Sequence, residues 1–156
     1  MRAWPLLLLT ACADSFSEPD RSFISYEIMS EVEFDRLLII ADDRDGRAVL
    51  HPTFPPRVTE YHFTHMQPAV MTYDWLLVVA FKRDEQVGAG LASLQYTSTG
   101  DPELPTQTAT GKLRLDRNQL VELFGPSDFP CARVFMGDVV WETRRTGDSD
   151  CDGVPD

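Results

Sequence analysis

Positive charge is scarce in this sequence, since 14 lysines and arginines stand against 25 aspartates and glutamates and the formal net charge is -11. Nucleic-acid binding needs a cationic face that neutralises phosphates, so this balance argues against a nucleic-acid partner. Attraction to an anionic bilayer by charge alone is disfavoured for the same reason. An acidic surface suits divalent-cation binding, and the simpler interpretation is a soluble domain with carboxylates on its outside.

Motifs of catalysis are also missing. The chain has no Gly-x-Ser-x-Gly elbow, no phosphate-binding glycine loop and no His-Glu-x-x-His pair. The three histidines are His51, His62 and His65, and positions three apart on a strand point to opposite faces, so His62 and His65 cannot easily share one ion. A site built from Glu60, His62 and His51 across a hairpin stays open, and exposed strand residues are the simpler interpretation.

Short segments of alternating polarity predict a mainly β domain. The length of 156 residues fits one domain with an ordinary core. Residues 24–34 and 58–65 alternate between apolar and polar, which is typical of half-buried strands. Residues 75–81 are apolar throughout, so this strand should be covered on both faces and should form a central hairpin with residues 87–97. Residues 37–40 predict a further strand, which continues through an Asp-Gly turn into residues 47–50.

Residues 116–124 have the signals of one short helix. Asp116 is in the position of an N-cap, Gln119 follows three residues later as in a capping box, and Gly125-Pro126 is a stop signal. At about two turns such a helix depends on packing. We therefore predict an antiparallel β-sandwich of about eight strands with one short helix near 116–124, and an open β-barrel is the alternative.

The first twelve residues have the layout of an export signal. Arg2 carries one positive charge, residues 3–9 are apolar with four consecutive leucines, and small residues precede a cysteine. The apolar stretch is too short to span a bilayer as a helix. Leu9-Thr10-Ala11-Cys12 resembles the lipobox of bacterial lipoproteins. The resemblance implies that the signal peptide, residues 1–11, is removed and that acyl chains on Cys12 anchor the mature protein to a membrane.

The same resemblance implies a place in the bacterial cell envelope. Ala13 follows the cysteine, where an aspartate favours retention in the inner membrane of enterobacteria, so the outer membrane is favoured, on its periplasmic or its surface face. Residues 12–21 are polar and contain Pro19, and we expect them to form a lipidated tether for a β-rich domain at 22–145. The alternative interpretation of the apolar residues before Cys12 is a core segment that happens to end in cysteine.

The tail, residues 146–156, contains a spacing typical of calcium loops. Aspartates occupy positions 1, 3, 5 and 9, and glycine occupies position 6. This stretch resembles a thrombospondin type 3 calcium repeat, although the acidic residue expected three positions further on is absent, so the affinity should be weak, about 10⁻⁴ to 10⁻³ M. A frayed acidic tail is the alternative. The resemblance implies ligation by four side chains and one backbone carbonyl: Asp148, Asp150, Asp152, Asp156 and Val154.

The number of cysteines connects the two ends of the chain. Three are present, and lipidation of Cys12 would leave Cys131 and Cys151 as a pair in an oxidising compartment. Their disulfide would attach the tail to the β-rich domain, with two reduced cysteines as the alternative. Together these features predict a non-catalytic, membrane-anchored envelope lipoprotein that serves as a binding or assembly module, with an envelope protein as its partner and a weak calcium site. The competing class is a small secreted hydrolase or metal-dependent enzyme that uses His51, His62 or His65.

Overall fold

The protein is mainly β in the computed structural model, which describes residues 21–42, 48–68, 72–98, 100, 107–126, 130–143, 147–148 and 150–156. These residues form eleven strands and no helix. Nothing helical in this part of the chain has the length and apolar character needed to span a bilayer. The signal peptide, Cys12, most of the predicted tether and the Asp45-Gly46 turn lie outside the described residues.

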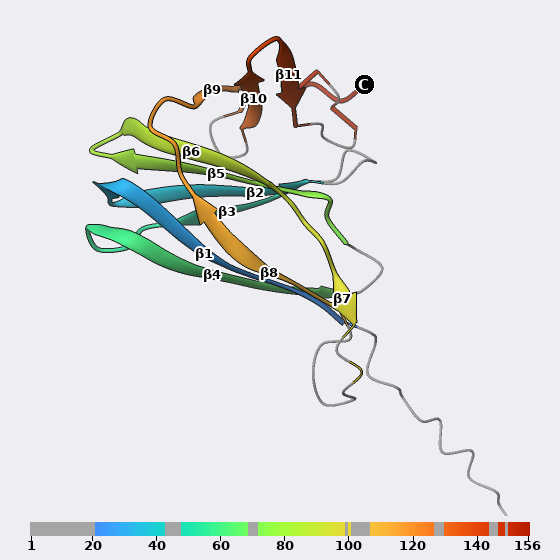
Figure 1. Ribbon diagram of the computed structural model, residues 1–156. Helices are drawn as coiled ribbons and strands as arrows, with labels where there is room; N and C mark the ends of the chain where they lie inside the picture. Colours follow the sequence, from blue (N-terminus) through green and yellow to red (C-terminus); the bar gives the residue numbers. More distant parts are fainter. Residues whose placement is uncertain are drawn as a thin grey trace, which may run out of the picture.

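The strands form three sheets (Figure 1), with the orders β4-β1-β8-β7, β3-β2-β5-β6 and β11-β10-β9. All neighbouring strands are antiparallel except β1 and β8, which are parallel. In chain order the strands are β1 (Arg21–Phe34), β2 (Arg36–Asp42), β3 (Ala48–Thr53), β4 (Val58–Pro68), β5 (Trp75–Lys82), β6 (Glu85–Ser93), β7 (Thr97–Ser98), β8 (Gln107–Arg114), β9 (Leu120–Phe124), β10 (Cys131–Met136) and β11 (Val139–Glu142).

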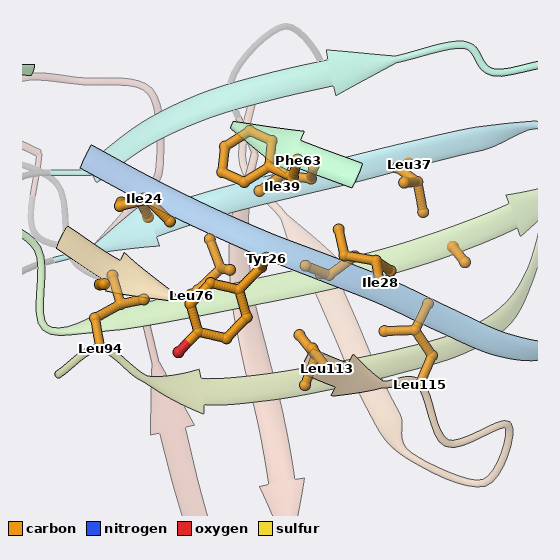
Figure 2. Close-up of a cluster of buried hydrophobic side chains, with 14 of the residues drawn as sticks. Ile24, Tyr26, Ile28, Leu37, Ile39, Phe63, Leu76, Leu94, Leu113 and Leu115 are labelled. Carbon is orange, nitrogen blue, oxygen red and sulfur yellow. The ribbon is translucent and has the colours of Figure 1, made fainter. Parts of the chain in front are cut away.

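The second sheet, β3-β2-β5-β6, is covered on both faces. Leu76 and Val78 of β5 pack in a cluster with residues of the first sheet, whereas their neighbours Leu77 and Val79 pack in a second cluster with residues of the third sheet. Figure 2 shows the first cluster, in which side chains of β1, β2, β5 and β8 converge. The continuous apolar run of β5 therefore has the double coverage that the sequence predicts, and the predicted pairing of β5 with β6 is confirmed.

The first and second sheets are hydrogen-bonded at one edge. The Asp116 backbone N–H, just beyond β8, donates to the Ala89 carbonyl of β6 at 2.9 Å, and the Ala89 N–H donates back to the Asp116 carbonyl at 3.0 Å. Glycines permit this close approach: a Cβ on Gly90 would lie 2.9 Å from Leu113, and one on Gly88 would lie 3.3 Å from Leu115. Two sheets that touch in this way leave no room between β6 and β8 for larger side chains.

The helix predicted at 116–124 is wrong. The Asp116 carboxylate accepts a hydrogen bond from the Asn118 N–H at 2.8 Å, which forms a turn with the same sequence signature as a helix N-cap. The chain then forms β9, in which Val121 and Leu123 face the second sheet and pair with Val134 and Ala132 of β10. Pairing with β10 satisfies the backbone of this segment, whereas a two-turn helix would leave most of its N–H and C=O groups without internal partners.

The predicted sandwich of about eight strands is not confirmed, because the described residues form three sheets from eleven strands. The alternative of an open barrel is not confirmed either. One unpredicted element is the start of β8: residues 107–110 pair with β1, and Ala109 is fully buried. The alternating residues of a strand show which face is buried, but they do not show which sheet covers it.

The double coverage of β5 predicts that Leu76→Ala and Leu77→Ala each lower the free energy of unfolding by about 2 to 5 kcal/mol, since each leaves a cavity in a different cluster. Urea unfolding of the purified protein measures this. Leu120→Ala is the matched control, because Leu120 is 68% exposed and its truncation should cost no more than about 0.5 kcal/mol. A cost as small as the control for Leu77→Ala would contradict coverage of that face by the third sheet.

Candidate metal-binding tail and its disulfide

A disulfide joins the tail to the third sheet. It links Cys131, the first residue of β10, to Cys151, with the Cα atoms 6.2 Å apart and 20 positions apart in the chain. Both cysteines are buried, and the Cα separation is within the range usual for disulfides. The predicted pairing of Cys131 with Cys151 is therefore present in the structure.

Gly125 makes the contact between the tail and the body possible. Its φ is +83°, and a Cβ on this residue would lie 2.6 Å from the Cys151 carbonyl oxygen. Only glycine combines that backbone conformation with such a close neighbour. Gly125 is predicted to end a helix, and in the structure it instead lets the backbone of Cys151 pack against the end of β9.

Three of the predicted calcium ligands form a cluster. One carboxylate oxygen each of Asp148, Asp150 and Asp152 lies within 4.8 Å of the other two. Asp148 is buried, whereas Asp150 and Asp152 are exposed. Carboxylate oxygens are the ligands that hard cations such as Ca²⁺ prefer. Three negative charges this close repel one another, so a divalent cation that bound them would also relieve that repulsion.

Backbone N–H groups of the tail hold all three carboxylates in place. The Gly153 N–H donates to Asp148 Oδ2 at 3.2 Å and the Val154 N–H donates to Asp152 Oδ1 at 2.7 Å. The Asp152 N–H donates to Asp150 Oδ1 at 3.3 Å. These bonds curl the backbone of residues 150–154 around the three carboxylates.

Asp156 does not belong to this cluster within the described residues. Its backbone N–H donates to the Gly147 carbonyl at 2.9 Å, which brings the two ends of the loop together. Gly147 and Gly153 have φ values of +80° and +86°, and the turns of the loop depend on that freedom. Asp148, Asp150 and Asp152 are thus the predicted ligands that the structure brings together, and Val154 lies two positions after Asp152 in the chain.

The three histidines lie on two strands that belong to different sheets. His62 and His65 are on β4 and point to opposite faces of the first sheet, as their spacing predicts, whereas His51 is on β3 in the second sheet. The hairpin on which the combination of Glu60, His62 and His51 was predicted does not form, because β3 and β4 follow each other in the chain without pairing. The side chain of His51 is outside what the structure describes.

His62 has one polar contact of chemical interest. Its Nε2 lies 3.0 Å from the Ser25 hydroxyl on the outer face of the first sheet. A nucleophile needs its base to be oriented by a third group, and among the described residues no group hydrogen-bonds the other ring nitrogen of His62. The nearest carboxylate across the strands, that of Glu27, is instead paired with Lys112 at 3.0 Å. Ser25 and His62 thus form a hydrogen bond between β1 and β4.

His65 is part of the packing between the sheets. Its ring stacks with Phe63 at 6.4 Å between centroids and lies 6.5 Å from the ring of Tyr73. Burial lowers the pKa of His65 below its usual value, so the neutral ring is favoured at neutral pH. The half-buried ring of His65 therefore packs beside two aromatic residues of the first cluster, Phe63 and Tyr73.

One further hollow, of about 120 Å³, opens on the outer face of the first sheet where the register of β1 against β4 shifts. The Arg114 guanidinium and the Glu31 carboxylate lie 3.6 Å apart at this hollow. The sequence gives no sign of it, because the residues come from three strands that are distant in the chain. They are Met29, Ser30, Glu31, Thr59, Glu60 and Arg114.

No protein-family model, curated protein or solved structure matches this chain. The function therefore has to be inferred from its own residues.

The disulfide predicts that the double variant Cys131→Ala with Cys151→Ala loses about 3 kcal/mol of unfolding free energy, the loop-entropy value for a closed loop of this size. Urea unfolding under non-reducing conditions measures the loss. A reductant should destabilise the parent by a similar amount and should leave the double variant unchanged. Equal stability of parent and variant without reductant would mean that the tail is not held by this bond.

Proposed function

We propose that this protein is a non-catalytic lipoprotein of the bacterial cell envelope, anchored by lipid on Cys12 and acting as a binding or assembly module. The observation that carries the proposal is the buried disulfide between Cys131 and Cys151. Disulfides of this kind persist in oxidising compartments outside the cytosol. The only other cysteine in the sequence is Cys12, at the end of the lipobox-like segment.

The position of β1 supports an anchored orientation. β1 begins at Arg21, nine residues after Cys12, and nine extended residues reach about 30 Å. In Figure 1 the beginning of β1 is at the lower right and the third sheet is at the top, on the far side of the second sheet. An anchor at Cys12 would therefore hold the start of β1 close to the membrane and direct the third sheet away from it.

We infer further that the tail is a weak calcium site. The cluster of Asp148, Asp150 and Asp152 and the backbone N–H groups that hold it support this inference. Extracellular calcium modules commonly bind in the range of about 10⁻⁴ to 10⁻³ M, which matches calcium levels outside the cytosol better than those inside it. The ion would stabilise a segment that the disulfide already attaches to β10.

The lipid anchor is tested by expressing the full chain in a bacterium supplied with an alkyne-labelled palmitate. The label should be incorporated into the parent and lost in Cys12→Ala, because only the thiol of the lipobox accepts a lipid. The matched control is the double variant Cys131→Ala with Cys151→Ala, which should remain labelled. An unlabelled parent, or label that persists in Cys12→Ala, would refute the anchor.

Calcium binding predicts a rise in Tm. At about 10 mM Ca²⁺ a site with a Kd of about 10⁻⁴ to 10⁻³ M gains roughly 1.4 to 2.7 kcal/mol of stability, which corresponds to a rise of several degrees. The rise should disappear in Asp150→Asn and persist in the control Asp138→Asn, which removes a carboxylate from the β10–β11 turn. Mg²⁺ at the same concentration is the comparison ion. An unchanged Tm in the parent would contradict the calcium site.

A further inference from the structure

Exposed apolar side chains are concentrated on the third sheet. The described residues include eight exposed large apolar side chains, and five of them belong to β9, β10 and β11. Surface apolar residues that occur singly are ordinary, but a contiguous group marks an interaction site. We call these five the apolar tip: Leu120, Phe135, Met136, Val139 and Val140.

The strand register shows how the apolar tip is built. Leu120 and Val140 both pair with Phe135, so these three side chains form one row on the outer face of the sheet. Met136 pairs with Val139 at the next position, so these two point to the opposite face. Both faces of the hairpin end are therefore apolar and exposed, and this shape fits into a cleft better than it fits onto a flat surface.

A tight turn fixes the end of this hairpin. Met136 and Val139 are paired, and only Gly137 and Asp138 lie between them. Gly137 has a φ of +61°, as the first position of a two-residue II′ turn requires. The backbone conformation of the apolar tip is therefore fixed before any partner binds, which lowers the entropy cost of docking.

Acidic groups border the apolar tip. The next row on the outer face is Glu122, Arg133 and Glu142, in which Arg133 donates to Glu142 at 2.6 Å and to Glu122 at 3.0 Å. These hydrogen bonds, the one with Glu142 first, raise the pKa of Arg133, and the row has a net charge of -1. Asp138 is at the turn itself, so the border is negative on both sides of the row.

This charge pattern selects among the possible occupants. A second copy of the chain would bring the same acidic border and a net charge of -11 against its own, which opposes association. An anionic lipid surface is opposed for the same reason, and Asp138 at the end of the hairpin opposes insertion. A protein cleft with an apolar centre and lysines or arginines at its rim is complementary in both respects.

We propose that the apolar tip is the docking surface for a second envelope protein, whose contact site is an apolar cleft bordered by basic side chains. This inference rests on the proposed function in two respects. The proposed envelope location gives the compartment of the partner, and the proposed anchor at Cys12 would direct the third sheet away from the membrane. The inference names the partner class of the proposed binding module. The geometry of the tip itself is independent of the anchor.

Site-specific photocrosslinking in the bacterium that makes the full chain tests the proposal. Benzoylphenylalanine replaces Val139 in the tip or, as the control, Thr64, which is exposed on the first sheet. Illumination should link position 139, and not position 64, to one envelope protein. The linked peptide should contain apolar residues flanked by lysine or arginine, and about 0.5 M salt should reduce the yield.

A second variant separates docking from folding. Leu120→Asp adds a charge at a side chain that is already mostly exposed, so its Tm should match that of the parent while the crosslink at position 139 falls by about tenfold or more. A crosslink to a second copy of this chain, to lipid alone or to an acidic surface would overturn the proposal. Equal yields at positions 139 and 64, or no crosslink at either, would also overturn it.

The proposed lipid anchor and the proposed docking surface can each be wrong while the other is correct. Cys12→Ala removes the proposed lipid while leaving the tip intact. If Cys12→Ala keeps its crosslink and the parent carries no palmitate label, the anchor is wrong and the docking surface stands. If the parent is labelled and position 139 does not crosslink, the docking surface is wrong and the anchor stands.

Discussion

The structure depends on covering both faces of its second sheet. β5 has no polar face, because Leu76 and Val78 point to one side and Leu77 and Val79 to the other. The first sheet, which contains the long strand β1, buries one side of the second sheet. The short third sheet has to bury the other, and it does so with Val121, Ala132 and Val134. Its hairpin is longer than this task requires, which leaves apolar residues exposed beyond the covered area.

The sequence predicted individual strands better than their arrangement. β1, β4 and β5 followed from patterns within a single segment, because alternation or a continuous apolar run is local information. The helix at 116–124 failed since Leu120, Val121, Leu123 and Phe124 fit both a helical and a strand period, and the deciding factor was pairing with β10, which comes later in the chain. The parallel pairing of β1 with β8 had no local signal either.

The candidate site was predicted in part for the same reason. The aspartate spacing and the cysteine count are readable in the chain, and the structure brings Asp148, Asp150 and Asp152 together and joins Cys131 to Cys151. The hairpin predicted to join His51 to Glu60 and His62 does not form, because the consecutive strands β3 and β4 belong to different sheets. The apolar tip was missed altogether, because apolar strand residues such as Phe135 and Val140 are ordinarily buried, and only the three-dimensional structure shows that nothing among the described residues covers them.

The parallel partner of β1 constrains the order of folding. Ser22 pairs with Gln67 on β4 and with Gln107 on β8, so the first strand of the domain needs neighbours from the middle and from the last third of the chain. Contacts this distant form late and slow the folding of the whole domain. A polypeptide that emerges with its amino end first can pair β1 with β4 early, but the other edge of β1 stays unpaired until β8 has followed.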